Sequence, residues 1–505
     1  MPPSYLSLKE VSFAGAAITQ PLESKEFSAA GRVPLVVDLD GTLTPSDTLF
    51  ELFAAGLLHK PLATLACLPS LNFDPSFFKH KLAAVSPLDP ASIPWRQELL
   101  DYLKQEKEGG RDIHLMTAAD DTVAATVAQF SGLFSSATGS HPGYNLKGEK
   151  KLAVMKEKFP GGFEYIGDSK ADLPIWKHSG IAHVAGNVTR MEKMIHGQGG
   201  IALGRTFADH RPGLKTWLKA LRAHQWSKNV LILVPWGLAG IFSFSSLAAS
   251  IAVFLVFNLI ASATYLVNDF VDLPVDRRHP TKKLRPLASG QLTIPMAGAF
   301  VAGAVPASLL LIGLIAPGAL PYVLAYIVLT LSYSLWLKKA AFFDTACLAA
   351  LFTLRVAIGI AVIGVPMSPW LLSFSGLFFF SLALAKRHLE VMKAGKDSAY
   401  DLGGRGYGAD DWPVTLSFGV ASALSSIVIM MLFIQDPATQ DKYASPAWLY
   451  AIVAILLLWL MRIWRLSHRR QLDDDPITFA LKDRISIALG ALTGVAFILA
   501  HLGGS

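Results

Sequence analysis

Two pairs of aspartates in the first half of the chain have a spacing that suits phosphoryl chemistry. Asp38 and Asp40 come directly after a short apolar run, and Asp168 and Asp172 come after another. In the loop that follows a strand, one carboxylate of the first pair can attack a phosphorus atom while the other transfers a proton. The pattern therefore favours a site that handles phosphate groups.

A hydroxyl group and three cations lie between these two pairs. Thr117 ends the apolar run 113–116 and is a candidate donor to a phosphate, and Lys147, Lys150 and Lys151 supply positive charge. Each feature alone is common in turns and loops. Their order along the chain favours one catalytic site, with a degenerate, regulatory domain as the alternative.

A second acidic group occurs later in the chain. Asp269, Asp272 and Asp276 fall at i, i+3 and i+7, so on a helix they share one face. Three like charges at the end of an apolar segment repel one another unless divalent cations bind between them and a phosphorylated substrate. A solvated loop that only sets membrane topology does not explain this acid spacing.

The first set of residues is positioned by elements of an α/β domain. Short apolar runs at 34–37, 113–116 and 165–166 are each followed by polar or helix-starting residues, as in a parallel sheet. Side chains that follow such strands collect at one edge of the sheet, which is where ligands bind. The segment between Asp40 and Thr117 is expected to be helical and to form a small cap that selects the substrate.

The second set is positioned by apolar segments of membrane length. We expect about nine, near residues 229–242, 247–267, 294–314, 319–337, 344–364, 368–385, 413–433, 447–464 and 484–502. Basic residues gather in the loops before every second segment, which places those loops in the cytoplasm. The N-terminus lacks a secretory signal, so we expect the N-terminal domain in the cytoplasm and the C-terminus outside.

Composition agrees with this division. The 505 residues are 52% hydrophobic and 16% charged, against roughly 25% charged in soluble proteins, which argues against a purely water-soluble chain. Two cysteines exclude a disulfide framework and a four-cysteine zinc site. Residues 1–204 hold 19 Lys and Arg against 22 Asp and Glu, a net charge of −3, whereas residues 205–505 hold 26 against 16, a net charge of +10.

The ordered motifs DxDGT, Thr, Lys and GDxxxD, over about residues 33–185, resemble the haloacid dehalogenase superfamily. The resemblance implies a Rossmann-like fold in which Asp38 is the nucleophile, Asp40 the general acid/base and Thr117 a phosphate ligand. Lys151 would shield the phosphate, although its neighbouring lysines leave this choice open. Asp40 favours phosphate-ester hydrolysis over dehalogenation. The implied cofactor is Mg²⁺, held by Asp38, Asp40, Asp168 and Asp172.

The motif NDxxDxxxD within about nine spans resembles the UbiA superfamily of intramembrane prenyltransferases, over residues 222–503. The resemblance implies an all-α membrane domain in which Asp269 and Asp272 are catalytic. Mg²⁺ would be held by Asn268, Asp269, Asp272 and Asp276. Ordinary members carry a second aspartate-rich motif, but here the corresponding region has one carboxylate, Asp344, and two lysines.

With this departure, the sequence resembles the decaprenyl-phosphate phosphoribosyltransferase branch of the superfamily. This likeness implies transfer of a phosphoribosyl group from phosphoribosyl diphosphate to a polyprenyl phosphate. The diphosphate and 5-phosphate of the donor and the phosphate of the acceptor are three anionic groups, which call for more cations and fewer carboxylates in the site. Lys386 and Arg387 are equally interpretable as residues that set topology. The residues expected to bind substrate are Lys228, Lys282, Lys283, Arg285, Tyr333, Lys338, Asp344, Arg355, Lys386 and Arg387.

We therefore expect a membrane transferase with a fused phosphatase that removes the 5-phosphate from its product. One alternative is a UbiA-type prenyltransferase that moves a polyprenyl group from its diphosphate to an aromatic acceptor. Another is a membrane-anchored scaffold without turnover.

The expected boundaries are residues 1–204 for the hydrolase domain, 205–225 for a linker with an amphipathic basic segment, and 226–505 for the transferase domain. The expected location is the inner (cytoplasmic) membrane of a bacterium. The expected partners are the lipid bilayer, a polyprenyl phosphate and a diphosphate donor, and not nucleic acid. The oligomeric state stays open.

Overall fold

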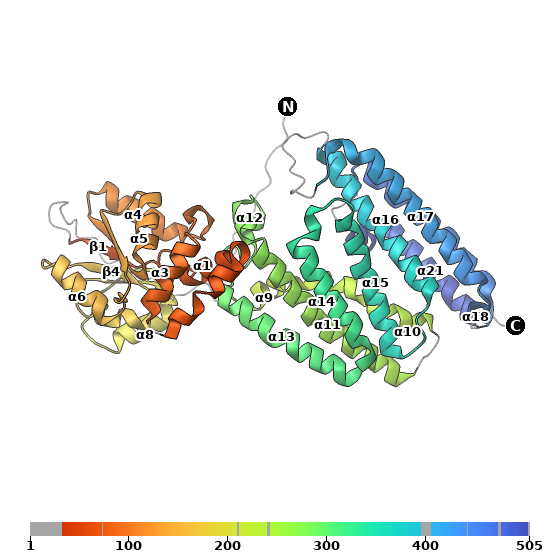
Figure 1. Cartoon of the computed structure of the whole chain (residues 1–505), viewed down its shortest axis with the longest axis horizontal. Helices are drawn as coiled ribbons and strands as arrows, with labels where there is room; N and C mark the ends of the chain where they lie inside the picture. Colours follow the sequence, from red (N-terminus) through yellow and green to blue (C-terminus); the bar gives the residue numbers. More distant parts are fainter. Residues whose placement is uncertain are drawn as a thin grey trace, which may run out of the picture.

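The protein forms two bodies that lie end to end along its longest axis (Figure 1). One combines a β-sheet with helices, and the other is built from long helices. These two bodies confirm the fold class expected from the sequence. The structure is a computed structural model that describes residues 33–72, 74–209, 212–239, 243–394, 406–441, 443–472 and 476–502.

The sheet of the first body has six parallel strands in the order β3-β2-β1-β4-β5-β6. Strand β1 lies in the interior of the sheet, between β2 and β4. Its residues Leu35, Val36 and Val37 are all apolar and fully buried, as expected for a parallel sheet covered on both faces. The last strand continues past residue 204, where we expected the domain to end. The strands are β1 Leu35–Val37, β2 Ile113–Asp120, β3 Ser136–Ser140, β4 Glu164–Gly167, β5 Ala182–Gly186 and β6 Leu203–Ala208.

Helices cover both faces of this sheet (Figure 1). Helices α4 (Gln97–Glu108) and α5 (Asp121–Ser131) pack into one apolar core, and α6 (Glu149–Lys158) and α8 (Val188–His196) pack into the other. Because all six strands are parallel, the loops after them meet at one edge of the sheet.

The segment between β1 and β2 is largely helical, as expected for a small cap. It contains α1 (Thr48–His59), α2 (Pro61–Leu65) and α3 (Pro75–Val85) before α4 joins the core. Helix α1 begins at a defined point because the side chain of Asp47 accepts a hydrogen bond from the backbone N–H of Leu49 (2.9 Å). This cap fixes the start of α1 beside the aspartates that follow β1.

Eight helices in the described part of the chain are long and apolar enough to cross a membrane. Many of their large apolar side chains face outward, among them Leu310, Val328 and Leu458, which indicates that lipid rather than water covers them. The helices are α11 Phe244–Val271, α13 Ile294–Ile315, α14 Leu320–Leu335, α15 Phe343–Ile363, α16 Pro369–Ala394, α17 Trp412–Gln435, α19 Leu449–His468 and α21 Arg484–Leu502.

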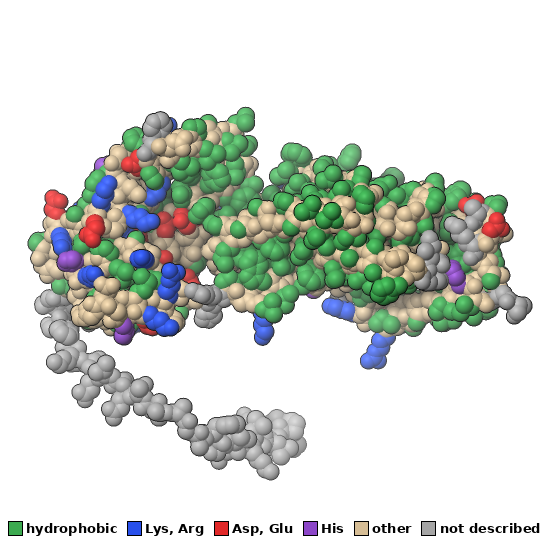
Figure 2. Space-filling view, turned by 90° about the horizontal axis from the view of Figure 1, so that it is seen from below, with side chains coloured by type: hydrophobic (Ala, Val, Ile, Leu, Met, Phe, Trp, Pro, Cys, Tyr) green, Lys and Arg blue, Asp and Glu red, His purple; other side chains and the backbone are tan. Residues whose placement is uncertain are grey.

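The same contrast is visible on the molecular surface. Figure 2 shows hydrophobic side chains spread along the helical body, whereas Lys, Arg, Asp and Glu side chains gather on the N-terminal body. A membrane-embedded domain and a water-exposed domain are expected to differ in this way.

The first predicted membrane segment, 229–242, contains no membrane-length helix among the described residues, so the long apolar helices there number eight rather than the nine expected from the sequence. Residues there form the 3₁₀ helix η4 (Ala223–Ile232) and the short helix α10 (Val234–Leu238). A 3₁₀ helix rises about 2.0 Å per residue, so it covers a given length with fewer residues than an α-helix.

The chain from Arg222 to Trp236 nevertheless runs antiparallel to α11 along most of its length. Hydrogen bonds join Trp226 to Ser262 (3.1 Å), Asn229 to Asn258 (2.7 Å) and Trp236 to Ser246 (3.2 Å). An Arg222–Asp269 ion pair continues this series at the other end of α11. The segment thus follows the path that a ninth span would take.

Gly359 permits this close packing. A Cβ atom at position 359 of α15 would lie 2.2 Å from the carbonyl oxygen of Ile232. Any side chain there would push η4 away from α15.

Candidate functional site

The aspartates predicted to do phosphoryl chemistry lie together at the carboxyl edge of the sheet. Asp38 and Asp40 follow β1, and Asp168 and Asp172 follow the neighbouring strand β4. The backbone N–H of Asp38 donates to the carbonyl of Ile166 (3.0 Å), so the two loops leave the sheet side by side.

A buried hydrogen-bond network connects three charged groups at this edge. The Nζ atom of Lys151 lies 2.8 Å from Oδ2 of Asp38 and donates to the hydroxyl of Tyr165 (3.0 Å). That hydroxyl lies 2.8 Å from Oδ1 of Asp172 and 3.3 Å from Oδ2 of Asp38. Burial opposes a charged lysine, but Asp38 and Asp172 outweigh it and raise the pKa of Lys151. Lys151, rather than Lys147 or Lys150, is therefore the cation paired with Asp38.

The donor set fits a divalent cation. Oxygen atoms of Asp38, Asp168 and Asp172 all lie within 4.8 Å of one another. Burial, followed by the charge of Asp172, raises the pKa of Asp168 to about 8. A cation among these carboxylates would relieve their repulsion, and hard divalent ions such as Mg²⁺ prefer oxygen ligands.

Asp40, which was also expected to hold Mg²⁺, lies outside this group of three carboxylates. Its Oδ1 accepts a hydrogen bond from the backbone N–H of Thr48 (2.7 Å), the first residue of α1. Burial, followed by the charge of Asp47, raises the pKa of Asp40 to about 7. A carboxyl group with a pKa near neutral can both donate and accept a proton.

Gly41 allows the two aspartate loops to approach each other. Its φ angle is +73°, which favours glycine, and a Cβ atom there would lie 2.2 Å from Oδ2 of Asp168. The glycine of the DxDGT pattern is thus required by both backbone conformation and space.

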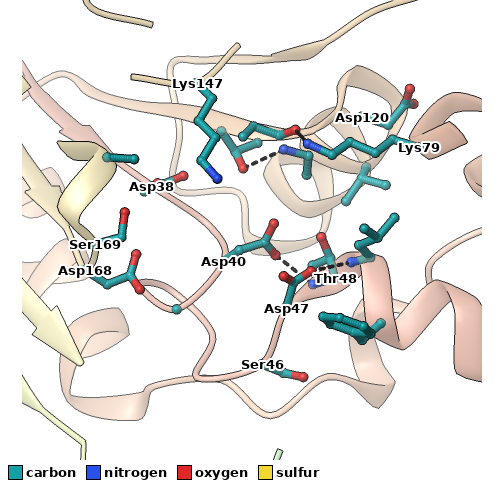
Figure 3. Close-up of a pocket in the computed structure, with 18 of the residues that line it drawn as sticks. Asp38, Asp40, Ser46, Asp47, Thr48, Lys79, Asp120, Lys147, Asp168 and Ser169 are labelled. Carbon is teal, nitrogen blue, oxygen red and sulfur yellow. Dashed lines mark hydrogen bonds between the residues drawn. The ribbon is translucent and has the colours of Figure 1, made fainter. Parts of the chain in front are cut away.

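These residues line a cavity of 530 Å³ between the sheet and the cap. This volume is within the range of sites for small organic ligands, so the cavity can hold more than a phosphate ion. In Figure 3, Lys147 extends toward the space between Asp38 and Asp40, and Lys79 approaches from the other side. Thr117 also lines the cavity, together with Thr293 and Pro295 from the start of α13 in the membrane domain.

The second acidic group lies where α11 ends and α12 (Leu273–Arg278) begins. Asp269 forms ion pairs with Arg222 and with Arg285, whose Nη1 is 3.2 Å from Oδ1. Arg285 also pairs with Asp276. Burial raises the pKa of Asp276, while the charge of Arg285 opposes the shift.

The third carboxylate of this group, Asp272, pairs with Lys338 and accepts a hydrogen bond from the amide of Asn268 (3.1 Å). In the described part of the chain these carboxylates do not gather as closely as those around Asp38. Carboxylate oxygens suit Mg²⁺, but the paired cations must move aside for a metal to reach all three.

A separate charged group surrounds Asp344 at the start of α15. Its Oδ2 forms an ion pair with Arg387, and its Oδ1 accepts a hydrogen bond from the hydroxyl of Tyr407 (2.8 Å). Arg387 also pairs with Glu390. The single carboxylate that occupies the place of a second acidic motif is therefore neutralised by an arginine.

Arg355 is not brought to either acidic group. It lies inside the helical body, where it donates to Oδ1 of Asn229 (2.7 Å) and the hydroxyl of Tyr326 (3.1 Å). Its guanidinium also lies 5.8 Å from the ring centre of Phe257. These contacts indicate that Arg355 joins α15 to η4, α11 and α14.

The other predicted substrate-binding residues have fewer described contacts. Lys228 lies 6.0 Å from the ring centre of Phe352, next to the group around Arg355. Lys282 and Lys283 form part of a short 3₁₀ helix that follows α12. Tyr333 is near the end of α14, and Lys386 lies within α16.

Sequence reasoning missed two functional candidates. Tyr165 belongs to a strand, and its apolar neighbours give no sign that its hydroxyl joins Asp38 to Asp172. Arg222 is one of several basic residues before the first apolar segment, with no motif to distinguish it. Its guanidinium lies 5.0 Å from the ring centre of Tyr265, which orients it toward Asp269.

Comparisons with known proteins agree with this division of the chain. The model of the UbiA prenyltransferase family matches residues 230–488, and that of the haloacid dehalogenase-like hydrolases matches residues 35–177. The first match contains Asp269, Asp272 and Asp276, and the second contains the aspartates around Asp38.

Individual proteins are similar over different lengths. An uncharacterized protein of Sinorhizobium fredii, y4nM, is 42% identical over 479 residues, which are 93% of this chain and 91% of that protein. Decaprenyl-phosphate phosphoribosyltransferase of Corynebacterium glutamicum is 37% identical over 180 residues, which are 35% of this chain and 54% of that enzyme. The solved structure of a UbiA homolog from Archaeoglobus fulgidus, bound to GPP and Mg²⁺, is 14% identical, with a TM-score of 0.43 over 56% of this chain and 98% of that one.

The eight apolar helices make the C-terminal body an integral membrane domain, and the family match covers most of it. The chain therefore belongs to the UbiA prenyltransferase family, with a haloacid dehalogenase-like domain in front of the membrane domain.

Proposed function

We propose that the membrane domain transfers a phosphoribosyl group from phosphoribosyl diphosphate to a polyprenyl phosphate. The observation that carries this proposal is the number of cations at the acidic motif: Arg222, Arg285 and Lys338 all pair with its carboxylates. A donor with a diphosphate and a 5-phosphate, together with a phosphate acceptor, brings enough negative charge to use these cations.

The charge at Asp344 supports the same substrates. A second metal cluster would need free carboxylates there, but Asp344 is paired with Arg387. An arginine fork can bind a phosphate in place of a second metal, because it offers parallel N–H donors to two phosphate oxygens. The phosphoribosyltransferase of Corynebacterium glutamicum, similar over part of its length, adds support from comparison.

In this reaction Asp269 and Asp272 would hold Mg²⁺, assisted by Asn268 and Asp276. The metal would stabilise the negative charge that develops on the leaving diphosphate. The lipid phosphate would attack C1 of the ribose, and the bond between C1 and the diphosphate oxygen would break. Arg222, Arg285 and Lys338, released from the carboxylates, would bind phosphate oxygens.

We propose further that the N-terminal domain is a Mg²⁺-dependent phosphatase that removes the 5-phosphate from the lipid-linked product. Asp38 would attack phosphorus to form an aspartyl phosphate, while Asp40 gives a proton to the leaving ribose oxygen. Asp40 would then take a proton from the water that hydrolyses the aspartyl phosphate. The raised pKa of Asp40 supports this double role.

The same proposal includes an orientation. The N-terminal domain and the basic loops would lie on the cytoplasmic side of a bacterial inner membrane, and the C-terminus outside. Thr293 and Pro295 of the membrane domain line the phosphatase cavity, which supports delivery of a membrane-bound substrate to it.

The test is a donor and acceptor screen on the full chain in detergent with Mg²⁺. Labelled phosphoribosyl diphosphate with polyprenyl phosphate should give lipid-soluble label, and Asp269→Ala should abolish it. Product from a prenyl diphosphate and an aromatic acceptor, but not from the phosphoribosyl pair, would instead establish the aromatic prenyltransferase alternative.

A further inference from the structure

One arginine of the membrane domain is buried against the hydrolase domain. Both guanidinium Nη atoms of Arg277, in α12, donate to the carboxylate of Glu51, in α1, at 2.8 Å each. Nη1 also donates to the carbonyl of Ser92 (2.6 Å), and Nε donates to the carbonyl of Ala288 (3.2 Å). The side chains of Arg277 and Glu51 are each only 7% exposed.

Glu51 continues this connection into the phosphatase site. Its carboxylate accepts a hydrogen bond from the hydroxyl of Ser46. The carbonyl of Ser46 accepts a hydrogen bond from the backbone N–H of Gly41 (3.3 Å), the residue after Asp40. Two residues after Ser46, the backbone N–H of Thr48 binds the carboxylate of Asp40.

The segment between Ser46 and Glu51 thus has two attachments. Figure 3 shows Ser46 and Asp47 on the loop that leads into α1, which begins at Thr48 beside Asp40. On one side this loop holds the Asp40 carboxylate, and on the other Glu51 is held by Arg277 from the membrane domain. A small displacement of such a loop moves a catalytic group directly.

We propose that Arg277 is a positioning residue of the phosphatase site, so that the membrane domain sets the place of Asp40 through Glu51 and Ser46. This inference rests on the proposed phosphatase activity of the N-terminal domain. The bidentate fork is essential to it, because a lysine offers a single point charge to the same carboxylate.

The same helix provides a matched control. Arg278 also crosses to the hydrolase domain and pairs with Asp89, but its side chain is 64% exposed and that of Asp89 is 46% exposed. An exposed pair of this kind contributes little to stability. Arg278→Gln therefore removes one interdomain ion pair without touching the loop beside Asp40.

The experiment measures hydrolysis of p-nitrophenyl phosphate by the full chain in detergent with Mg²⁺. In Arg277→Gln and in Glu51→Gln, kcat should fall about 10- to 100-fold with KM nearly unchanged, because the loop positions a proton-transfer group. Arg277→Lys should recover only part of the rate, and Arg278→Gln should behave as the unaltered chain. The double variant should be no slower than the slower single variant, since both changes break one connection.

The outcomes separate the two hypotheses. If the chain shows no hydrolysis that Asp38→Asn removes, the phosphatase function fails and the positioning role fails with it. If hydrolysis depends on Asp38 but kcat is unchanged in both Arg277→Gln and Glu51→Gln, only the positioning role is overturned. A loss that Arg278→Gln reproduces equally would also overturn it, because general loosening of the interface would then explain the effect.

Discussion

Tyr165 joins two aspartates that stand more than a hundred positions apart in the sequence, Asp38 and Asp172. Its hydroxyl also accepts a hydrogen bond from Lys151, so the network has one cation for two carboxylates. All of these groups are buried, and buried charges are tolerated when they are paired and hydrogen-bonded.

Replacing Tyr165 by phenylalanine should therefore weaken the phosphatase without abolishing it. Lys151 keeps its direct contact with Asp38, but Asp172 loses a buried donor, and we expect kcat to fall about tenfold, equal to about 1.4 kcal/mol. Steady-state hydrolysis of a phosphate monoester measures this change. Tyr144→Phe is the matched control, because the hydroxyl of Tyr144 contacts the carbonyl of Lys150 outside the cavity. Equal rates for the two variants would show that the Tyr165 hydroxyl has no role.

The sequence predicts the role of a residue when that residue belongs to a short motif. Asp38, Asp40, Asp168 and Asp172 occur in short motifs, whose spacing indicates a shared site. The contacts of Arg355 depend on how four helical segments pack, and no spacing in the sequence reports that its side chain faces Asn229.

At the scale of elements, the side chains of Glu164 and His183 join the neighbouring strands β4 and β5 of the hydrolase domain. Glu164 of β4 contacts His183 of β5 (3.0 Å) and Arg111 (2.7 Å). Burial of Glu164 acts in the opposite direction, but the hydrogen bonds from His183 and Arg111 and the charge of Arg111 lower the pKa of Glu164 below its usual value of 4.5.

This shift predicts a pH-dependent contribution to stability. Since the folded pKa of Glu164 is the lower one, its stabilisation is present above pH 4.5 and disappears as the pH falls through the folded pKa. Glu164→Gln should destabilise the chain by about 1–2 kcal/mol at neutral pH and less in acid. Thermal unfolding at several pH values measures the difference, and a constant difference down to acid pH would contradict the linkage.

The elements themselves differ in how well sequence predicts them. Long apolar runs such as 294–314 coincide with helices, because continuous hydrophobicity over membrane length leaves few alternatives. The described part of the shorter run 229–242 forms η4 and α10 instead, and it packs against α11 and Gly359. Tertiary contacts determine its helix type.

At the scale of the whole molecule, residues 222–238 decide whether the chain crosses the membrane an even or an odd number of times. Eight long helices alone return the chain to the side on which it started, whereas a crossing by residues 222–238 adds a ninth passage. Its antiparallel contacts along α11 favour the second case.

The C-terminus is therefore expected on the side opposite the hydrolase domain. A reporter that is active only outside the cytoplasm, fused after residue 505, should be active, and a reporter that fluoresces only in the cytoplasm should stay dark. The same reporters fused before residue 1 should give the reverse pattern. Cytoplasmic signals at both ends would mean that residues 222–238 do not cross.

The two domains also share an interface next to the hydrolase cavity, since Thr293 and Pro295 line that cavity and Arg277 pairs with Glu51. Sequence motifs locate each domain separately, but they carry no information about this interface, because the residues that form it belong to no motif.

Phosphoribosyl diphosphate labelled with ¹⁴C in the ribose and ³²P in the 5-phosphate tests the central claim most directly. The full chain, incubated with this donor, polyprenyl phosphate and Mg²⁺, should place ¹⁴C in the lipid phase with much less ³²P. Asp38→Asn should give both labels in equal proportion, and Asp269→Ala should give neither. Absence of ¹⁴C from the lipid phase would contradict the transferase, and an equal ratio of the two labels without the Asp38 substitution would contradict its coupling to the phosphatase.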